Sequence, residues 1–161
     1  MAILDSGERR EFDSGAVRDI QEGKGRCDLL PLDIIYIVTG DVCFNYLDKF
    51  IKTGEYSYLI KTFNHYIEHH LNGYYTALLE VSIHYEEGCK KYGKRNWEKG
   101  IPLHCFIDSG VRHYIKFLRG DKDERHDRAF LWNMLGALWT LRNKPELNDL
   151  PFATKDDNDE V

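Results

Sequence analysis

Apolar side chains recur with the spacing of α-helices along most of this 161-residue chain. Ala77, Val81 and Tyr85, for example, fall on one stripe at four-residue intervals, as in a helix with one buried face. Glycine and proline separate the periodic segments, and no segment alternates as a convincing strand does. The pattern therefore predicts an all-α bundle of about five to six helices. The expected helical segments are about 31–38, 41–51, 56–71, 74–92, 102–118 and 124–142.

The periodic segments define one helical domain with an extension at each end. Residues 1–28 are rich in Gly, Asp, Arg and Lys and are expected to form an irregular N-terminal arm. Residues 29–143 are the single helical domain. Residues 144–161 are expected to be a C-terminal tail, acidic at its end, because Pro145 and Pro151 prevent the last helix from continuing.

Composition narrows the class of protein. Hydrophobic residues make up 42% of the chain and charged residues 30%, which permits a packed core. The net charge of −5 argues against a nucleic-acid partner, although it leaves room for a bound phosphate. No apolar run is long enough to span a bilayer, and the first residues do not resemble a signal peptide. The four cysteines are widely spaced, so we expect reduced thiols in a cytoplasmic protein.

The fourth predicted helix carries a first candidate site. Glu80, His84 and Glu87 stand at i, i+4 and i+7, so their side chains share one face. Such a row can hold a hard divalent cation at a helix interface. The alternative, which spacing alone favours, is a solvated stripe in which Lys91 is an ion-pair partner.

The fifth and sixth helices carry further candidates. Asp108 and Arg112 are most simply a helix-surface ion pair, and His113 flanks the apolar face of the same helix. Glu124 and Asp127 form an E-x-x-D sequence. Because Asp127 projects into an apolar arc, it needs a metal ion or an arginine, unless it only caps the helix N-terminus.

Two more groups have polar atoms that need partners. Asn133 is surrounded by apolar residues in mid-helix, seven residues after His126, and either contacts a base or phosphate or bridges to a neighbouring helix. In the loop after the fourth helix, Arg95 and Lys99 suit phosphate oxygens. Trp97 in that loop either stacks on a base or closes the end of the bundle.

Several segments resemble a phage and prophage domain family that is named for the N-terminal domain of dATP/dGTP diphosphohydrolases. The most specific is the K-Y-G-x-R-N-W-E-K-G block at 91–100. The other segments that resemble the family are 15–31, 84–102, 108–113 and 123–133. The resemblance covers most of residues 14–142. It implies a protein of nucleotide metabolism in a bacterial host, without the second, catalytic domain that gives the family its name.

The resemblance also implies a reaction. The family is similar to the MazG-like all-α pyrophosphohydrolases, which cleave nucleoside triphosphates between the α- and β-phosphates. Those enzymes hold Mg²⁺ between an E-x-x-E helix and an E-x-x-D helix. Glu124 and Asp127 match the second element, whereas Glu80 and Glu87 lack the spacing of the first. We therefore expect hydrolysis of a purine deoxynucleoside triphosphate with Mg²⁺, or Mn²⁺ as the alternative.

On this resemblance each candidate receives a role. The expected catalytic residues are Glu87, Glu124 and Asp127. The expected metal ligands are Glu80, His84, Glu87, Glu124 and Asp127. The expected contacts to the nucleotide are Lys91, Arg95, Asn96, Trp97, Lys99, Arg112, His113, His126 and Asn133. A homo-oligomer is also expected, with the aromatic-rich segment 40–72 at its interface, unless these rings build an intramolecular layer instead.

Two alternatives remain open. The first is a non-catalytic module that binds or sequesters a nucleotide or a nucleotide-derived signal, which the unmatched first metal element favours. The second is a phosphohydrolase of the HD type, whose H…HD…D ligand order is reproduced by His113, His126, Asp127 and Asp149.

Overall fold

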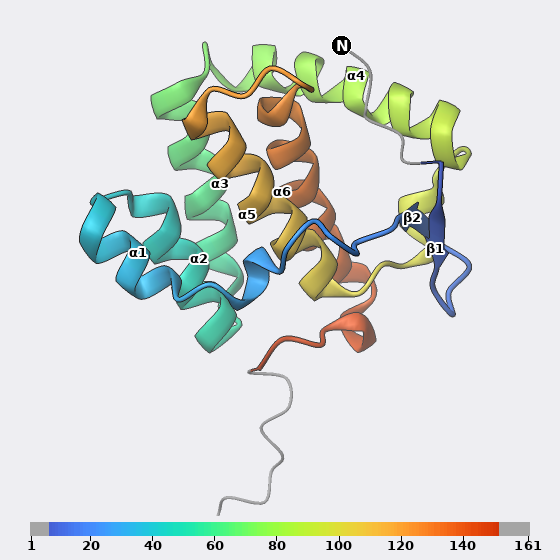
Figure 1. The fold of residues 1–161 in the computed structure, drawn as a ribbon, viewed down its shortest axis with the longest axis horizontal. Helices are drawn as coiled ribbons and strands as arrows, with labels where there is room; N and C mark the ends of the chain where they lie inside the picture. Colours follow the sequence, from blue (N-terminus) through green and yellow to red (C-terminus); the bar gives the residue numbers. More distant parts are fainter. Residues whose placement is uncertain (1–6, 152–161) are drawn as a thin grey trace, which may run out of the picture.

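The computed structural model describes residues 7–151, and most of them lie in α-helices (Figure 1). The all-α prediction is confirmed, and each predicted helix is found within about three residues of its expected bounds. The expected acidic end of the tail, 155–161, lies outside the described residues. The helices are α1 Leu32–Thr39, α2 Val42–Thr53, α3 Tyr56–His70, α4 Tyr74–Tyr92, α5 Leu103–Arg119 and α6 His126–Asn143. The short 3₁₀ turns are η1 Cys27–Leu29, η2 Asn96–Lys99 and η3 Pro145–Leu147.

The helix ends follow local sequence signals. The Asp41 side chain accepts a hydrogen bond of 2.9 Å from the backbone N–H of Cys43 and so caps α2. Gly54 ends the same helix with a φ of 70°, a left-handed conformation that glycine adopts at little cost. These caps explain why the helix bounds were readable from the sequence.

Helices α5 and α6 run antiparallel through the centre of the molecule, and α4 crosses this pair (Figure 1). The two central helices approach closely at Gly136, where a Cβ atom would overlap the ring of Phe106. The aromatic side of the pair packs against α3, with the ring of Tyr66 4.5 Å from Phe130 and 5.8 Å from Tyr114. These three side chains are fully buried. They form the centre of the hydrophobic core.

The aromatic-rich segment 40–72 contributes to that core. Phe44, Phe50 and Tyr66 are buried within the chain itself. These rings therefore build an intramolecular layer, and the homo-oligomer stays a prediction. No helix among the described residues is long and apolar enough to cross a membrane.

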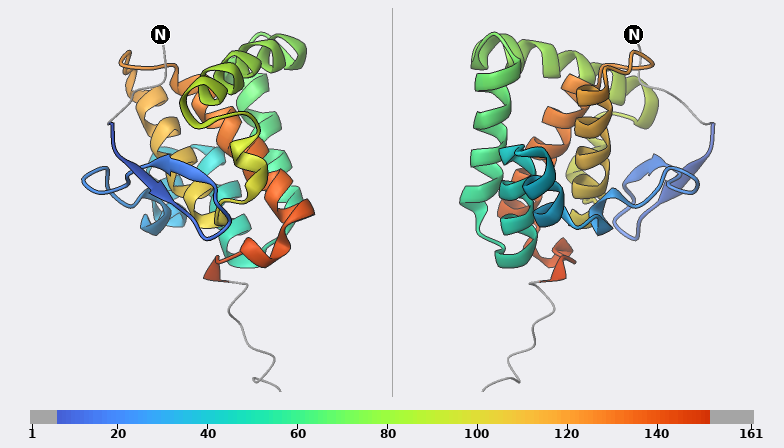
Figure 2. Two further views of the ribbon diagram at one scale, coloured as in Figure 1. Left: turned by 90° about the vertical axis from the view of Figure 1, so that its right-hand side faces the viewer. Right: turned by 60° about the vertical axis from the view of Figure 1, so that its left-hand side comes forward.

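The N-terminal arm contains a small β-hairpin, which the sequence did not predict. Strands β1 (Arg9–Glu11) and β2 (Val17–Asp19) pair antiparallel, with Arg10 opposite Arg18. The expectation of no strand is therefore wrong here, because three-residue strands are too short to show an alternating pattern. Beyond the hairpin the chain crosses α5 to reach η1 and α1 (Figure 2). The hairpin lies beside the C-terminal part of α4.

Candidate functional site

A pocket of about 460 Å³ lies beneath the hairpin, between the arm, α4, the loop after α4, α5 and α6. Six basic and three acidic side chains line it, together with four aromatic rings of Tyr and Trp. Its basic lining residues are Arg10, Arg18, Lys24, Arg95, Arg112 and Lys116. The pocket is therefore more basic than the acidic chain as a whole, which suits a planar, anionic ligand.

The arm is fastened to the helical domain by polar contacts that mimic backbone pairing. The Asn96 side chain accepts from the backbone N–H of Val17 and donates to its carbonyl oxygen, both at 2.8 Å. Asn96 is buried, so losing these bonds would leave its amide without partners. This predicted nucleotide contact thus fixes strand β2 in place.

Asp108 and Arg112 hold the loop that follows the hairpin. Asp108 accepts hydrogen bonds from the backbone N–H of Cys27, at 2.7 Å, and from Gln21. Arg112 pairs with Asp108 and donates to the carbonyl oxygens of Lys24, at 3.1 Å, and Gly25, at 3.0 Å. The expectation of a simple surface pair is wrong, because Asp108 is buried beneath the arm.

Arg18 enters the pocket from β2 and is not among the site residues that the sequence predicts. Its guanidinium donates to the carbonyl oxygen of Cys105, at 3.1 Å, and to Asn133 Oδ1, at 3.2 Å. It also lies 5.5 Å from the ring centre of Phe106 and 5.3 Å from that of Trp132. Burial lowers the pKa of Arg18 from its ordinary value. Periodicity gave no signal for this residue, because it lies in a short strand of the arm.

Asn133 is the mid-helix residue whose amide was expected to contact either a ligand or a neighbouring helix. Its Nδ2 donates to the Ala129 carbonyl, at 2.7 Å, and to Ser109 Oγ, at 3.3 Å, while its Oδ1 accepts from Arg18. It therefore bridges α6 to α5 and to the arm. It also lines the pocket.

Aromatic side chains form another part of the wall. Trp97 packs edge-on against Tyr85, at 5.6 Å between ring centres, and against Trp139, at 5.0 Å. Trp97 lines the pocket as well, so it both packs against the bundle and offers a surface to a ligand. His84 lies beside Trp132, and burial lowers its pKa to about 4, which keeps it neutral at pH 7.

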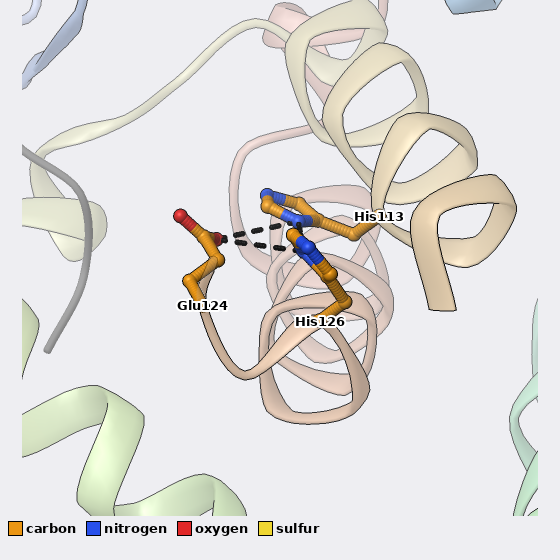
Figure 3. A group of neighbouring side chains, drawn as sticks. All are labelled: His113, Glu124 and His126. Carbon is orange, nitrogen blue, oxygen red and sulfur yellow. Dashed lines mark hydrogen bonds and ion pairs between the residues drawn. The ribbon is translucent and has the colours of Figure 1, made fainter. Parts of the chain in front are cut away.

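A group of potential metal ligands lies at the junction of α5 and α6 (Figure 3). His113 Nδ1 is 3.0 Å from His126 Nδ1 and 3.3 Å from Glu124 Oε1. The other ring nitrogen of His126 is 2.7 Å from a carboxylate oxygen of Asp123. Asp123 therefore holds the Nε2 side of the ring, and Nδ1 of His126 faces His113 and Glu124. Burial lowers the pKa of His113 well below its ordinary value, so the imidazole of His113 is neutral at pH 7.

This group differs from the five ligands expected from the sequence. Within residues 7–151, Glu124 belongs to a cluster of three metal-ligating side chains, whereas Glu80, His84, Glu87 and Asp127 do not. Glu80 instead accepts from Arg128 Nε at 2.8 Å, and Asp127 is 2.6 Å from Arg125. Arginine is thus the partner that the carboxylate of Asp127 required.

Two expected phosphate contacts are used in holding the arm. Lys91 Nζ lies 2.9 Å from Asp19, and Lys99 donates to the carbonyl oxygen of Gly15 at 3.3 Å. Arg95 lines the pocket while pairing with Glu98 at 2.6 Å. Lysines that are already paired are weaker candidates for binding phosphate.

The H…HD…D set of the second alternative is not assembled. His113 and His126 are adjacent, but Asp127 pairs with Arg125. Asp149 instead accepts from the backbone N–H of His104, at 2.9 Å, and contacts the ring of that residue. All four cysteines, which fall in the described part of the chain, are free thiols.

Fold and site together define an all-α domain with a basic, aromatic pocket next to a histidine–carboxylate cluster. Residues 67–150 match the family described as dATP/dGTP diphosphohydrolase, N-terminal. The match covers more than half of the chain, which therefore belongs to this family. It includes α4, α5 and α6 but not the hairpin. No curated protein and no solved structure gave a match.

Proposed function

We propose that this chain binds a purine deoxynucleoside triphosphate beneath the hairpin and hydrolyses it to a nucleoside monophosphate and pyrophosphate. The observation that carries the proposal is the pocket itself, in which arginines and aromatic rings share one cavity with His113 and Glu124. Arginines suit phosphate oxygens, and aromatic faces suit a base. The family description supports nucleotide hydrolysis in general.

The proposal places a divalent cation at His113, Glu124 and His126. Two imidazoles and one carboxylate converge there, and Asp123 contacts the other ring nitrogen of His126 and so orients that ring. Two histidines and one carboxylate are a donor set of catalytic zinc sites, and this set suits Mn²⁺ or Zn²⁺ better than the Mg²⁺ expected from the sequence. Bound there, such a cation supplies positive charge that polarises a phosphate and a water molecule.

The test is product analysis of dATP and dGTP with Mg²⁺, Mn²⁺ or Zn²⁺. We expect the monophosphate and pyrophosphate as products. Glu124→Gln keeps the shape of the side chain but removes its charge, and it should lower kcat/KM about 100-fold. Glu86→Gln is the matched control, because Glu86 is exposed on α4, pairs with Lys90 and does not line the pocket. This control should keep the wild-type rate.

Asp127→Asn distinguishes the proposed metal position from the E-x-x-D position expected from the sequence. Asp127 lies in an ion pair with Arg125, so its replacement should lower kcat/KM less than about tenfold. A loss as large as that of Glu124→Gln would return the cation to the E-x-x-D pair.

The non-catalytic nucleotide-binding module is the second candidate function. Two carboxylates of the pocket wall, Asp19 and Asp108, favour this function, because both already pair with basic side chains of the chain. The pocket still has more basic than acidic side chains, as an anion-binding site does. Nucleotide binding that survives EDTA, without turnover of any triphosphate, would support this function.

A further inference from the structure

Two arginines stand directly opposite each other in the hairpin. Arg10 on β1 pairs with Arg18 on β2, and both side chains line the pocket. Directly opposed residues of an antiparallel pair project from the same face, and like charges in that arrangement destabilise the sheet. Burial is the main cause that lowers the pKa of Arg18, and the nearby charge of Arg10 lowers it further. An unliganded hairpin therefore holds two cations that repel each other.

The hydrogen bonds of Arg10 are incomplete. One guanidinium nitrogen donates to Gln21 Oε1 at 2.9 Å, and the guanidinium lies 5.0 Å from the ring centre of Phe12. The Nε atom is buried and has no hydrogen-bond partner among residues 7–151. A buried donor without an acceptor is costly, so this atom marks a place where an acceptor belongs.

The acceptors that Arg18 contacts within the described part of the chain are neutral. Its hydrogen bonds go to a backbone carbonyl and to the Asn133 amide. Among residues 7–151, neither Arg10 nor Arg18 forms an ion pair with a carboxylate. The nearby carboxylate of Asp19 contacts Arg9, Lys24 and Lys91 instead. Within this part of the chain, no acid neutralises the two arginines.

We propose that Arg10 and Arg18 together form the phosphate-binding element of the pocket. An anion with several oxygens that contacts both guanidinium groups would offset their repulsion and give Arg10 Nε its acceptor. The inference deepens the proposed function and rests on it in taking this anion to be the phosphate chain of the nucleotide. Both arginines lie outside residues 67–150, so the helices matched to the family would need the hairpin to complete the site.

The hairpin is held well enough for such a role. Asn96 fixes Val17, the neighbour of Arg18, through two hydrogen bonds of 2.8 Å. Gln21, which contacts Arg10, is itself bonded to Asp108 at 3.0 Å. The two guanidinium groups are therefore positioned before a ligand arrives, which lowers the entropic cost of binding.

The experiment compares Arg10→Gln and Arg18→Gln with Arg26→Gln, in EDTA so that no metal contributes. Arg26 is the matched control, because it lies in the same arm and pairs with Asp28 without lining the pocket. Calorimetry would measure the Kd of inorganic tripolyphosphate, dATP and deoxyadenosine. We expect each hairpin variant to weaken tripolyphosphate and dATP at least tenfold, and Arg26→Gln to change them less than twofold.

Stability of the unliganded protein gives a second readout. Arg10→Gln removes the repulsion, so its Tm without ligand should equal or exceed that of the wild type. A purely structural arginine would lower Tm instead. If Arg18→Gln does not fold, Arg18→Lys is measured in its place, because lysine keeps the positive charge. Its affinity for tripolyphosphate should lie between that of the wild type and that of a variant without the charge.

Each result bears on the proposal. Unchanged affinity for tripolyphosphate in both hairpin variants would overturn it, as would a wild type that binds neither tripolyphosphate nor dATP. Equal weakening of deoxyadenosine and dATP would show a distorted pocket and would also overturn it. If the variants lose anion binding while the wild type hydrolyses nothing, the arginine pair stands and the proposed hydrolysis fails. If the wild type and the arginine variants bind and turn over dATP equally, the proposed hydrolysis stands and the proposed role of the arginine pair fails.

Discussion

The two sides of the α5–α6 pair differ in the kind of side chain that covers them. On one side, Tyr114 and Phe130 pack against α3 with ring centres 5.0 Å apart and no exposure to solvent. On the other side, Arg112, His113 and Asn133 face the arm and a cavity of about 460 Å³. The same two helices thus present a filled apolar face and an open polar one.

We expect the filled apolar face to contribute to stability and the open polar face to contribute to ligand binding. The apolar face is completed by side chains of the chain itself, so its contribution is burial and close packing. The cavity on the polar side is lined by Arg10, whose Nε has no acceptor within residues 7–151, and two imidazoles with converging ring nitrogens lie on that side. Such groups gain most from a ligand. Changes on the first face should therefore alter unfolding, and changes on the second should alter ligand binding.

The largest loss of stability is expected from Phe130→Ala. The ring is fully buried against Tyr66 and Tyr114, and its removal leaves a cavity. The free energy of unfolding should fall by about 3–5 kcal/mol, measured by urea titration. Leu118→Ala, at a 46% exposed position on α5, should change it by less than about 0.5 kcal/mol. Similar losses at both positions would contradict the assignment of the core.

A smaller loss is expected where the two central helices touch. An added Cβ at Gly136 would overlap the Phe106 ring, so Gly136→Ala should cost about 1–3 kcal/mol. Gly110→Ala is the matched control, because its Cβ would clash with the flexible end of Met134, at 2.7 Å, and would lie 3.4 Å from the Cβ of Asn133, an ordinary contact distance. Its loss should be the smaller of the two in the same urea titration. The reverse order would mean that α5 and α6 are packed differently.

On the polar face, Asn96→Ala should affect binding more than stability. The variant removes both hydrogen bonds to Val17 and releases β2 from the loop after α4. Stability should fall by about 1–2 kcal/mol, while tripolyphosphate affinity falls at least tenfold because the arginines lose their position. Calorimetry on the folded variant would measure the affinity. Unchanged affinity would show that the hairpin keeps its place without this contact.

The smallest effect is expected from the contact that ties the chain after α6 to the start of α5. The hydrogen bond to Asp149 raises the pKa of His104 from its ordinary 6.5 to about 10. Burial opposes the shift at Asp149, but the bond from His104 lowers the pKa of that carboxyl below its ordinary value. The stabilisation by His104 is therefore complete below about pH 6.5 and is lost as pH rises towards 10. Asp149 adds stability that is lost in acid, below about pH 4.

The measurement is the Tm of the wild type minus that of His104→Asn across this pH range. The difference should be largest between about pH 5 and 6.5 and should shrink towards pH 10. A difference that stays constant from pH 5 to 10 would contradict a charged His104–Asp149 contact.

The sequence by itself determined the helices. Apolar periodicity, the Asp41 cap and the glycines that end α1 and α2 act within a few neighbouring residues, so they can be read without a fold. The sequence also indicated several residues that the structure places in the pocket wall, because polar side chains in apolar helix contexts or in a basic loop need partners. These pocket residues are Arg95, Asn96, Trp97, His113, Glu124 and Asn133.

Only the tertiary structure decided which partners those groups have. Spacing along one helix cannot show that Arg125 and Arg128 reach Glu80 from another helix, or that Glu124 turns towards His113 and His126. It also cannot show that Arg18 contacts Asn133, which lies more than a hundred positions further along the chain. Ion pairs and metal-ligand groups depend on where distant segments meet, and that is set by packing of the whole chain.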